Sequence, residues 1–165
     1  MERIDLHTHT LASDGSDAPA DVVRKAAALG LRAVAVTDHD TFAGLPEARA
    51  AGQRCGIEVV PGVELSTVWG GEEVHLLGYF MDTEDTALRA LMTRATDERN
   101  ARNETMVQRL HDAGYPITMD DLHAAFPGQT VLGRPHIAAL LVQRGCIASV
   151  PDGMRGLLGR GKEFY

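Results

Sequence analysis

Residues 33–40 have the sequence Ala33-Val34-Ala35-Val36-Thr37-Asp38-His39-Asp40. The first half is a continuous apolar run, which is typical of a β-strand buried on both faces and therefore of a parallel sheet covered by helices. The second half places one histidine between two carboxylates directly after that strand. Because ligands bind at the carboxyl ends of the strands in parallel α/β sheets, this stretch predicts both the fold class and the location of a functional site.

The segments on either side alternate between strand and helix patterns as far as residue 80. Further strands are expected at 2–8, 57–60, 63–66 and 73–80, with Pro61-Gly62 separating the middle pair as one broken strand or two short ones. Helices are expected at 18–29, capped by Ser16 or Asp17, and at 45–54, ended by Gly56. Alternating strands and helices predict an α/β fold with a mainly parallel sheet.

The pattern becomes entirely helical after Met81. Helices are expected at 84–113, 119–126, 134–144 and 151–158, and no convincing strand follows Phe80. We therefore divide the chain into an α/β part, residues 1–95, and a helical part, residues 96–165.

Composition limits the classes of function. The 165 residues include 16 Lys and Arg against 23 Asp and Glu, a formal net charge of −7, which argues against general binding to a nucleic-acid backbone. Two cysteines, Cys55 and Cys146, are too few for a disulfide scaffold, and both are expected to be small buried residues. Without a membrane-spanning apolar run or a secretory leader pattern, the sequence favours a cytoplasmic protein that does not contact membranes.

Six potential metal ligands lie on or directly after the four expected strands. They are His7, His9, Asp14, His39, Glu64 and His75. Residues two apart on a strand face the same side, so His7 and His9 can bind one ion. Mixed imidazole and carboxylate ligands suit Mn, Fe or Zn, and such ions promote hydrolysis of phosphate esters. Asp38 and Asp40 are expected instead to cap the following turn or to support the ligands.

These motifs resemble those of the polymerase and histidinol phosphatase (PHP) superfamily. The matching stretches are His7–Thr10, Ser13–Gly15, Thr37–Thr41, Pro61–Glu64 and Val74–Gly78. Residues 133–138 and 158–162 resemble one branch, metal-dependent phosphoesterases that include nucleoside 3′,5′-bisphosphate phosphatases and 5′-to-3′ exoribonucleases. The resemblance implies that residues 1–95 are the N-terminal part of a distorted (β/α)7 barrel and that residues 96–165 are a helical insertion or cap.

The resemblance also implies a role for each residue. His7 and His9 would bind one ion, Glu64 would bridge to a second ion bound by His75, and Asp14 and His39 would hold a third and act as the catalytic residues. Hydrolysis of a nucleotide or short oligonucleotide phosphate monoester would follow from attack of a metal-bound hydroxide. Arg134 and Lys162 would bind the substrate phosphate, and His136 is either a cap residue or a second phosphate contact. The helix carrying Arg94, Arg99, Arg102 and Arg109 alternates these with acidic residues and is expected to be a solvated face.

Members of this family continue beyond the point where this sequence stops, with further barrel strands, a strand-end histidine and an Asp-x-His pair that complete the ligands. We therefore expect a fragment or a shortened relative, with fewer than three ions and an open sheet edge that favours self-association. The alternative function is a catalytically incomplete module that only binds metal and phosphate. An amidohydrolase-like C–N hydrolase is disfavoured because no lysine occurs between Lys25 and Lys162.

Overall fold

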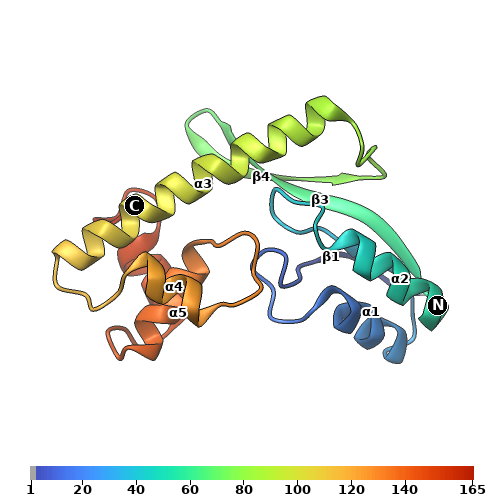
Figure 1. Ribbon diagram of the computed structural model, residues 1–165, viewed down its shortest axis with the longest axis horizontal. Helices are drawn as coiled ribbons and strands as arrows, with labels where there is room; N and C mark the ends of the chain where they lie inside the picture. Colours follow the sequence, from blue (N-terminus) through green and yellow to red (C-terminus); the bar gives the residue numbers. More distant parts are fainter. Residues whose placement is uncertain (1–2) are drawn as a thin grey trace. The chain divides into compact units, whose positions relative to one another are not determined.

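The computed structural model describes residues 3–165 (Figure 1). The chain forms two compact units, Met1–Thr96 and Asp97–Tyr165, and helix α3 (Thr86–Asp112) contributes to both. The units are described separately below.

The first unit contains a four-stranded sheet in the order β1-β2-β3-β4. The strands are β1 (Arg3–Thr8), β2 (Leu31–Val36), β3 (Glu58–Trp69) and β4 (Glu72–Tyr79). The β1–β2 and β2–β3 pairs are parallel, as predicted, whereas β3 and β4 form an antiparallel hairpin through Gly70 and Gly71. The expected break at Pro61-Gly62 is absent, because both residues continue β3 as one strand.

Two helices cover one face of this sheet. Helix α1 (Pro19–Ala28) and helix α2 (Leu45–Cys55) pack on β2 through a cluster that includes Val23, Val34 and Ala48, all at most 1% exposed. Full burial of a valine side chain stabilises the fold by about 1.5–3 kcal/mol. Gly56 ends α2 in the left-handed conformation, φ 67°, as its position predicted.

The predicted caps of α1 are wrong. The N-cap residue is Ala18, whose side chain makes no capping hydrogen bond. The Asp17 carboxylate instead accepts a hydrogen bond from Lys25 Nζ at 2.6 Å. The predicted burial of Cys55 is also wrong, since this residue is exposed.

The opposite face of the sheet is apolar and open. Ile4, Leu6 and Phe80 are 55%, 38% and 71% exposed. A groove of about 450 Å³ lies on this face, lined in part by Ile4, Leu6 and Tyr79. The Tyr79 hydroxyl donates to the Leu6 carbonyl at 2.7 Å, so the sheet curls around the groove as part of a barrel.

Within residues 97–165 the second unit contains helices and loops but no strands. After the C-terminal part of α3 come α4 (Met119–Ala125), α5 (Arg134–Gln143) and α6 (Val150–Gly153), which continues as a π-helix, η1 (Met154–Leu158). The core includes Met106, Leu110, Ile137 and Leu141, each at most 1% exposed. Among the described residues, no helix combines the length and apolar character that crossing a membrane requires.

Candidate metal centre

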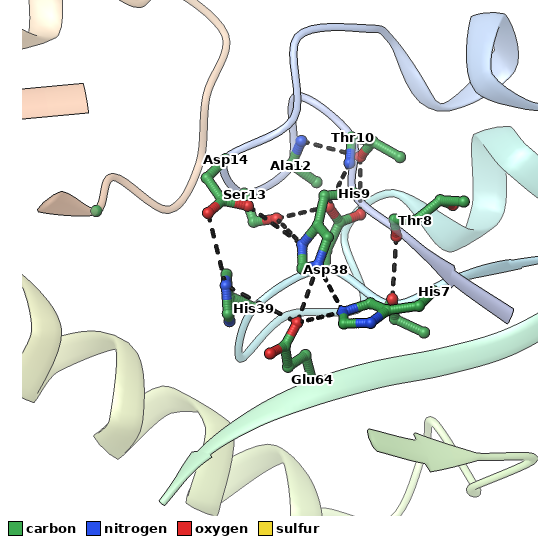
Figure 2. A network of polar contacts seen from close by, with 12 residues as sticks. His7, Thr8, His9, Thr10, Ala12, Ser13, Asp14, Asp38, His39 and Glu64 are labelled. Carbon is green, nitrogen blue, oxygen red and sulfur yellow. Dashed lines mark hydrogen bonds and ion pairs between the residues drawn. The ribbon is translucent and has the colours of Figure 1, made fainter. Parts of the chain in front are cut away.

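The six predicted ligands converge in the first unit, as Figure 2 shows for five of them. His7 lies on β1, and His9 and Asp14 lie in the loop that follows it. His39 follows β2 and forms an isolated parallel bridge with Glu64 of β3, which extends the sheet to the point where these side chains meet. The carboxyl ends of three parallel strands thus bring distant stretches of sequence together, as expected for this class of sheet.

Glu64 is the centre of this arrangement. Its side chain is only 8% exposed, and its Oε2 atom lies 2.8 Å from His7 Nε2 and 2.9 Å from His9 Nε2. Its Oε1 atom lies 2.7 Å from His75 Nδ1. Burial acts to raise the pKa of Glu64, but the His7 hydrogen bond, the neighbouring His39 charge and the His75 hydrogen bond outweigh it, so the pKa is lowered. Both oxygens of a single buried carboxylate therefore contact imidazoles.

His9 joins Glu64 to a second acidic group. Its Nδ1 atom lies 3.2 Å from Asp14 Oδ1, and His39 Nε2 lies 3.6 Å from Asp14 Oδ2. Burial acts to lower the pKa of His9, but the hydrogen bond and charge of Asp14, followed by the charge of Glu64, raise it above 6.5. The two carboxylates thus favour positive charge at His9.

The donor atoms fit divalent ions. Three overlapping groups have ligand atoms that all lie within 4.8 Å of one another: His7, His9, Glu64; His9, Asp14, His39; and His39, Glu64, His75. An ion with bonds of about 2.1 Å at right angles separates its ligand atoms by about 3 Å. In the first group the separation of His7 Nε2 and His9 Nε2 is 3.1 Å, close to this requirement. Mixed nitrogen and oxygen donors suit Mn, Fe or Zn.

His75 reaches the site by a different route from the one predicted. It lies inside the antiparallel strand β4 opposite Ser66, not at the end of a parallel strand. Glu64 pairs with Leu77, two residues after His75, so Glu64 and His75 are diagonal neighbours on the same face. The outer nitrogen of His75, Nε2, lies 3.8 Å from Glu73, a residue that the sequence pattern did not single out.

Asp38 and Asp40 belong to none of the three groups. Both are buried, at 1% and 2% exposure. Asp40 has φ 52° and its Oδ1 atom accepts a hydrogen bond from Ser66 N at 2.8 Å, which holds the chain next to Glu64. Its position agrees with a supporting role.

The three predicted phosphate-binding residues lie in the second unit. The Arg134 guanidinium lies over the ring of Tyr165, 5.2 Å from its centre, and Lys162 is exposed. His136 is 4% exposed, and its Nδ1 atom accepts a hydrogen bond from Gly133 N at 2.9 Å, so it caps the start of α5. A contact between His136 and substrate stays a prediction.

Arg99 and Arg102 correct the expectation of a solvated helix face. Both are partly buried, and the Nε atom of each is buried. The Arg102 guanidinium lies 5.9 Å from the centre of the Tyr165 ring, which Arg134 also covers. Spacing of three residues places Arg99 and Arg102 on one side of α3. This spacing could have indicated that the two arginines share one side of the helix. It could not indicate that Tyr165 covers part of that side, because Tyr165 is distant in the sequence.

Known proteins resemble this chain over nearly its whole length. The sequence pattern of the PHP domain matches residues 5–143. The 5′-3′ exoribonuclease Rnm of Salmonella typhimurium is 37% identical over 98% of this chain and 55% of its own length. The 3′,5′-nucleoside bisphosphate phosphatase of Chromobacterium violaceum is 36% identical over 100% of this chain and 58% of its own length.

A crystal structure of a protein from Bifidobacterium adolescentis, assigned to the metal-dependent phosphoesterases, superposes with a TM-score of 0.92 at 34% identity. The superposition covers 99% of this chain and 58% of that one. This chain therefore spans a little more than half the length of these similar proteins.

Proposed function

Because the chain belongs to the PHP domain family, we propose that it acts as a metal-dependent phosphoesterase on a phosphate monoester of a nucleotide or short oligonucleotide. The observation that carries this proposal is the set of three overlapping ligand groups around buried Glu64. The names of the two relatives support the substrate class, since one acts on RNA and the other on a nucleoside bisphosphate.

The predicted ligands would bind separate cations. Of up to three ions, His7, His9 and Glu64 would hold one, Glu64 and His75 a second, and Asp14 and His39 a third. When bound, Mn, Fe or Zn ions lower the pKa of a water molecule and polarise a phosphoryl oxygen. Asp14 and His39 are the catalytic residues in this proposal. The Asp14 carboxylate is 24% exposed, so it can contact substrate and accept a proton from the attacking water.

The second unit supplies the phosphate-binding residues in this proposal. Arg134 suits the task because a guanidinium binds phosphate oxygens in pairs, and Arg102 lies over the same Tyr165 ring. Lys162 adds a point charge, and His136 adds a second contact if its ring is reached by substrate. All four residues belong to one compact unit, Asp97–Tyr165.

The test is hydrolysis by the full chain loaded with Mn²⁺. A nucleoside 3′,5′-bisphosphate and a 5′-phosphorylated RNA oligonucleotide serve as substrates, and released phosphate or nucleotide is measured. We expect turnover that disappears when His7 and His9 are both replaced by alanine. Binding of Mn²⁺ and phosphate without turnover would support the alternative of a binding module. Absence of both would contradict the proposal.

We also propose that copies of the chain associate through the open edge of the sheet and that the protein acts in the cytoplasm. The edge strand β1 and the exposed side chains of Ile4 and Phe80 support association. Sedimentation of the chain and of an Ile4→Lys variant tests it. A monomer at all concentrations would exclude this association.

A further inference from the structure

The Asp38 carboxylate is buried beside the metal centre but is not one of its ligands. Oδ1 accepts hydrogen bonds from Thr10 N and from Ser13 Oγ, both at 2.7 Å. Oδ2 accepts one from Thr10 Oγ1, also at 2.7 Å. Hydrogen bonds to an ionised carboxylate are about twice as strong as neutral ones. Three of them offset the unfavourable burial of a charge that is only 1% exposed.

All three donors belong to the loop that carries two predicted ligands, His9 and Asp14 (Figure 2). Thr10 directly follows His9, and Ser13 directly precedes Asp14; both donors are fully buried. The backbone closes tightly between them, since Ser13 N and Gly15 N each donate to Thr10 O at 3.0 Å. Asp38 therefore holds the loop at both ends, one residue away from each ligand.

The hydroxyl of Ser13 extends this contact to a ligand side chain. Ser13 Oγ donates to Asp38 and also lies 3.3 Å from His9 Nδ1. Asp38 therefore contacts Thr10 and Ser13, the residues next to His9 and Asp14. It also immediately precedes His39, the third member of this ligand group.

Glycine at position 44 allows a second loop to close over the carboxylate. A Cβ atom at Gly44 would lie 2.8 Å from Asp38 Oδ2 and 3.0 Å from Thr10 Oγ1. Gly15 is similarly restricted, because a Cβ atom there would lie 2.4 Å from His9 O. Both glycines let the backbone approach without displacing these hydrogen bonds.

We propose that Asp38 is a positioning residue that fixes His9 and Asp14 against His39 before any cation binds. The inference rests on the proposed function, because it assumes that this group binds divalent ions. Carboxylates that orient the ligands of a metal raise its affinity by about 10- to 100-fold. Asp38 does so through the loop backbone and two hydroxyl groups.

The test measures Mn²⁺ affinity by calorimetric titration of the full chain, with a paired substitution at Thr10. Thr10→Val removes the hydroxyl and is expected to weaken Mn²⁺ binding about tenfold, whereas Thr10→Ser keeps it and should bind within about twofold of the original protein. Asp38→Ala should weaken binding by about 10- to 100-fold. Thr105→Val is the matched control, because its hydroxyl bonds Ala101 O on the exposed side of α3.

Amide hydrogen exchange provides a readout that needs no metal. Thr10 N donates to Asp38, so its exchange in the metal-free protein should accelerate in Asp38→Ala, but not in Thr105→Val. If Asp38→Ala does not fold, the Thr10 pair decides the question. Unchanged affinity in Thr10→Val, or equal loss in Thr10→Ser, overturns the positioning role. Failure of the original protein to bind Mn²⁺ overturns the proposed function instead.

Discussion

Replacing Glu64 with glutamine removes the charge at the centre of the candidate metal site while keeping the size of the side chain. Glu64 belongs to two of the three ligand groups, and its two oxygens contact His7, His9 and His75 at 2.7–2.9 Å. Only the group of His9, Asp14 and His39 does not use it. Glu64→Gln should therefore impair two cation positions at once.

The magnitude follows from the position of the carboxylate. Groups that merely orient a metal ligand change affinity by about 10- to 100-fold. A buried anionic ligand shared by two groups should contribute more, so we expect Mn²⁺ affinity at these positions to fall by more than about 100-fold. That factor corresponds to about 2.8 kcal/mol, at about 1.4 kcal/mol for each factor of ten.

Calorimetric titration combined with elemental analysis after gel filtration measures both the affinity and the number of ions. Glu58→Gln is the matched control, because Glu58 begins the same strand, β3, and belongs to none of the ligand groups. Thermal unfolding with excess Mn²⁺ gives an independent readout, since an ion that binds the folded state stabilises it by an amount that rises with the logarithm of its affinity. The reasoning is refuted if Glu64→Gln binds as many ions as Glu58→Gln with equal affinity.

Four other predictions concern pH, phosphate binding and the helical core. Since Asp14 and Glu64 raise the pKa of His9 and metal binding requires neutral imidazole, Mn²⁺ affinity should decline as pH falls, with a midpoint above 6.5; a lower midpoint in a pH series of titrations would contradict this. Without metal, protonated His9 stabilises the fold below pH 6.5, and this contribution is lost as the pH rises. Ionised Glu64 stabilises the fold above pH 4.5, and this contribution is lost as the pH falls. Urea unfolding should therefore show the greatest free energy of unfolding between these two pH values. Arg134→Lys should weaken phosphate binding about tenfold by loss of paired hydrogen bonds, whereas exposed Arg89→Lys should not; equal affinities in calorimetry would exclude the role of Arg134. Leu110→Ala should lower the free energy of unfolding by about 2–5 kcal/mol because Leu110 is fully buried, whereas Leu91→Ala, 44% exposed, should change it far less; equal changes in urea unfolding would contradict the assigned core.

The α/β fold and the grouping of ligands could be predicted because both depend on local pattern. The apolar run at 33–36 is buried in β2, and His39, three residues after it, lies where parallel strand ends meet. Spacing of two residues predicted that His7 and His9 face the same ion, and their Nε2 atoms are 3.1 Å apart.

Features that depend on contacts between distant residues could not be predicted. The antiparallel direction of β4 follows from its pairing with β3 and leaves no periodic pattern in the sequence. His75 therefore lies next to Glu64 across the β3–β4 hairpin. Arg99 and Arg102 alternate with acidic residues as a solvated face would, yet their side chains are partly covered in the folded unit. The positioning role of Asp38 depends on its hydrogen bonds to Thr10 and Ser13, which lie more than 20 residues earlier in the chain.

Anomalous diffraction from zinc-soaked crystals, recorded at the zinc absorption edge, tests the metal centre most directly. A peak is expected about 2.0–2.2 Å from His7 Nε2, His9 Nε2 and Glu64 Oε2. Zinc density confined to other parts of the protein, with these three atoms bound only to each other, would contradict the assignment of a cation site to these strands.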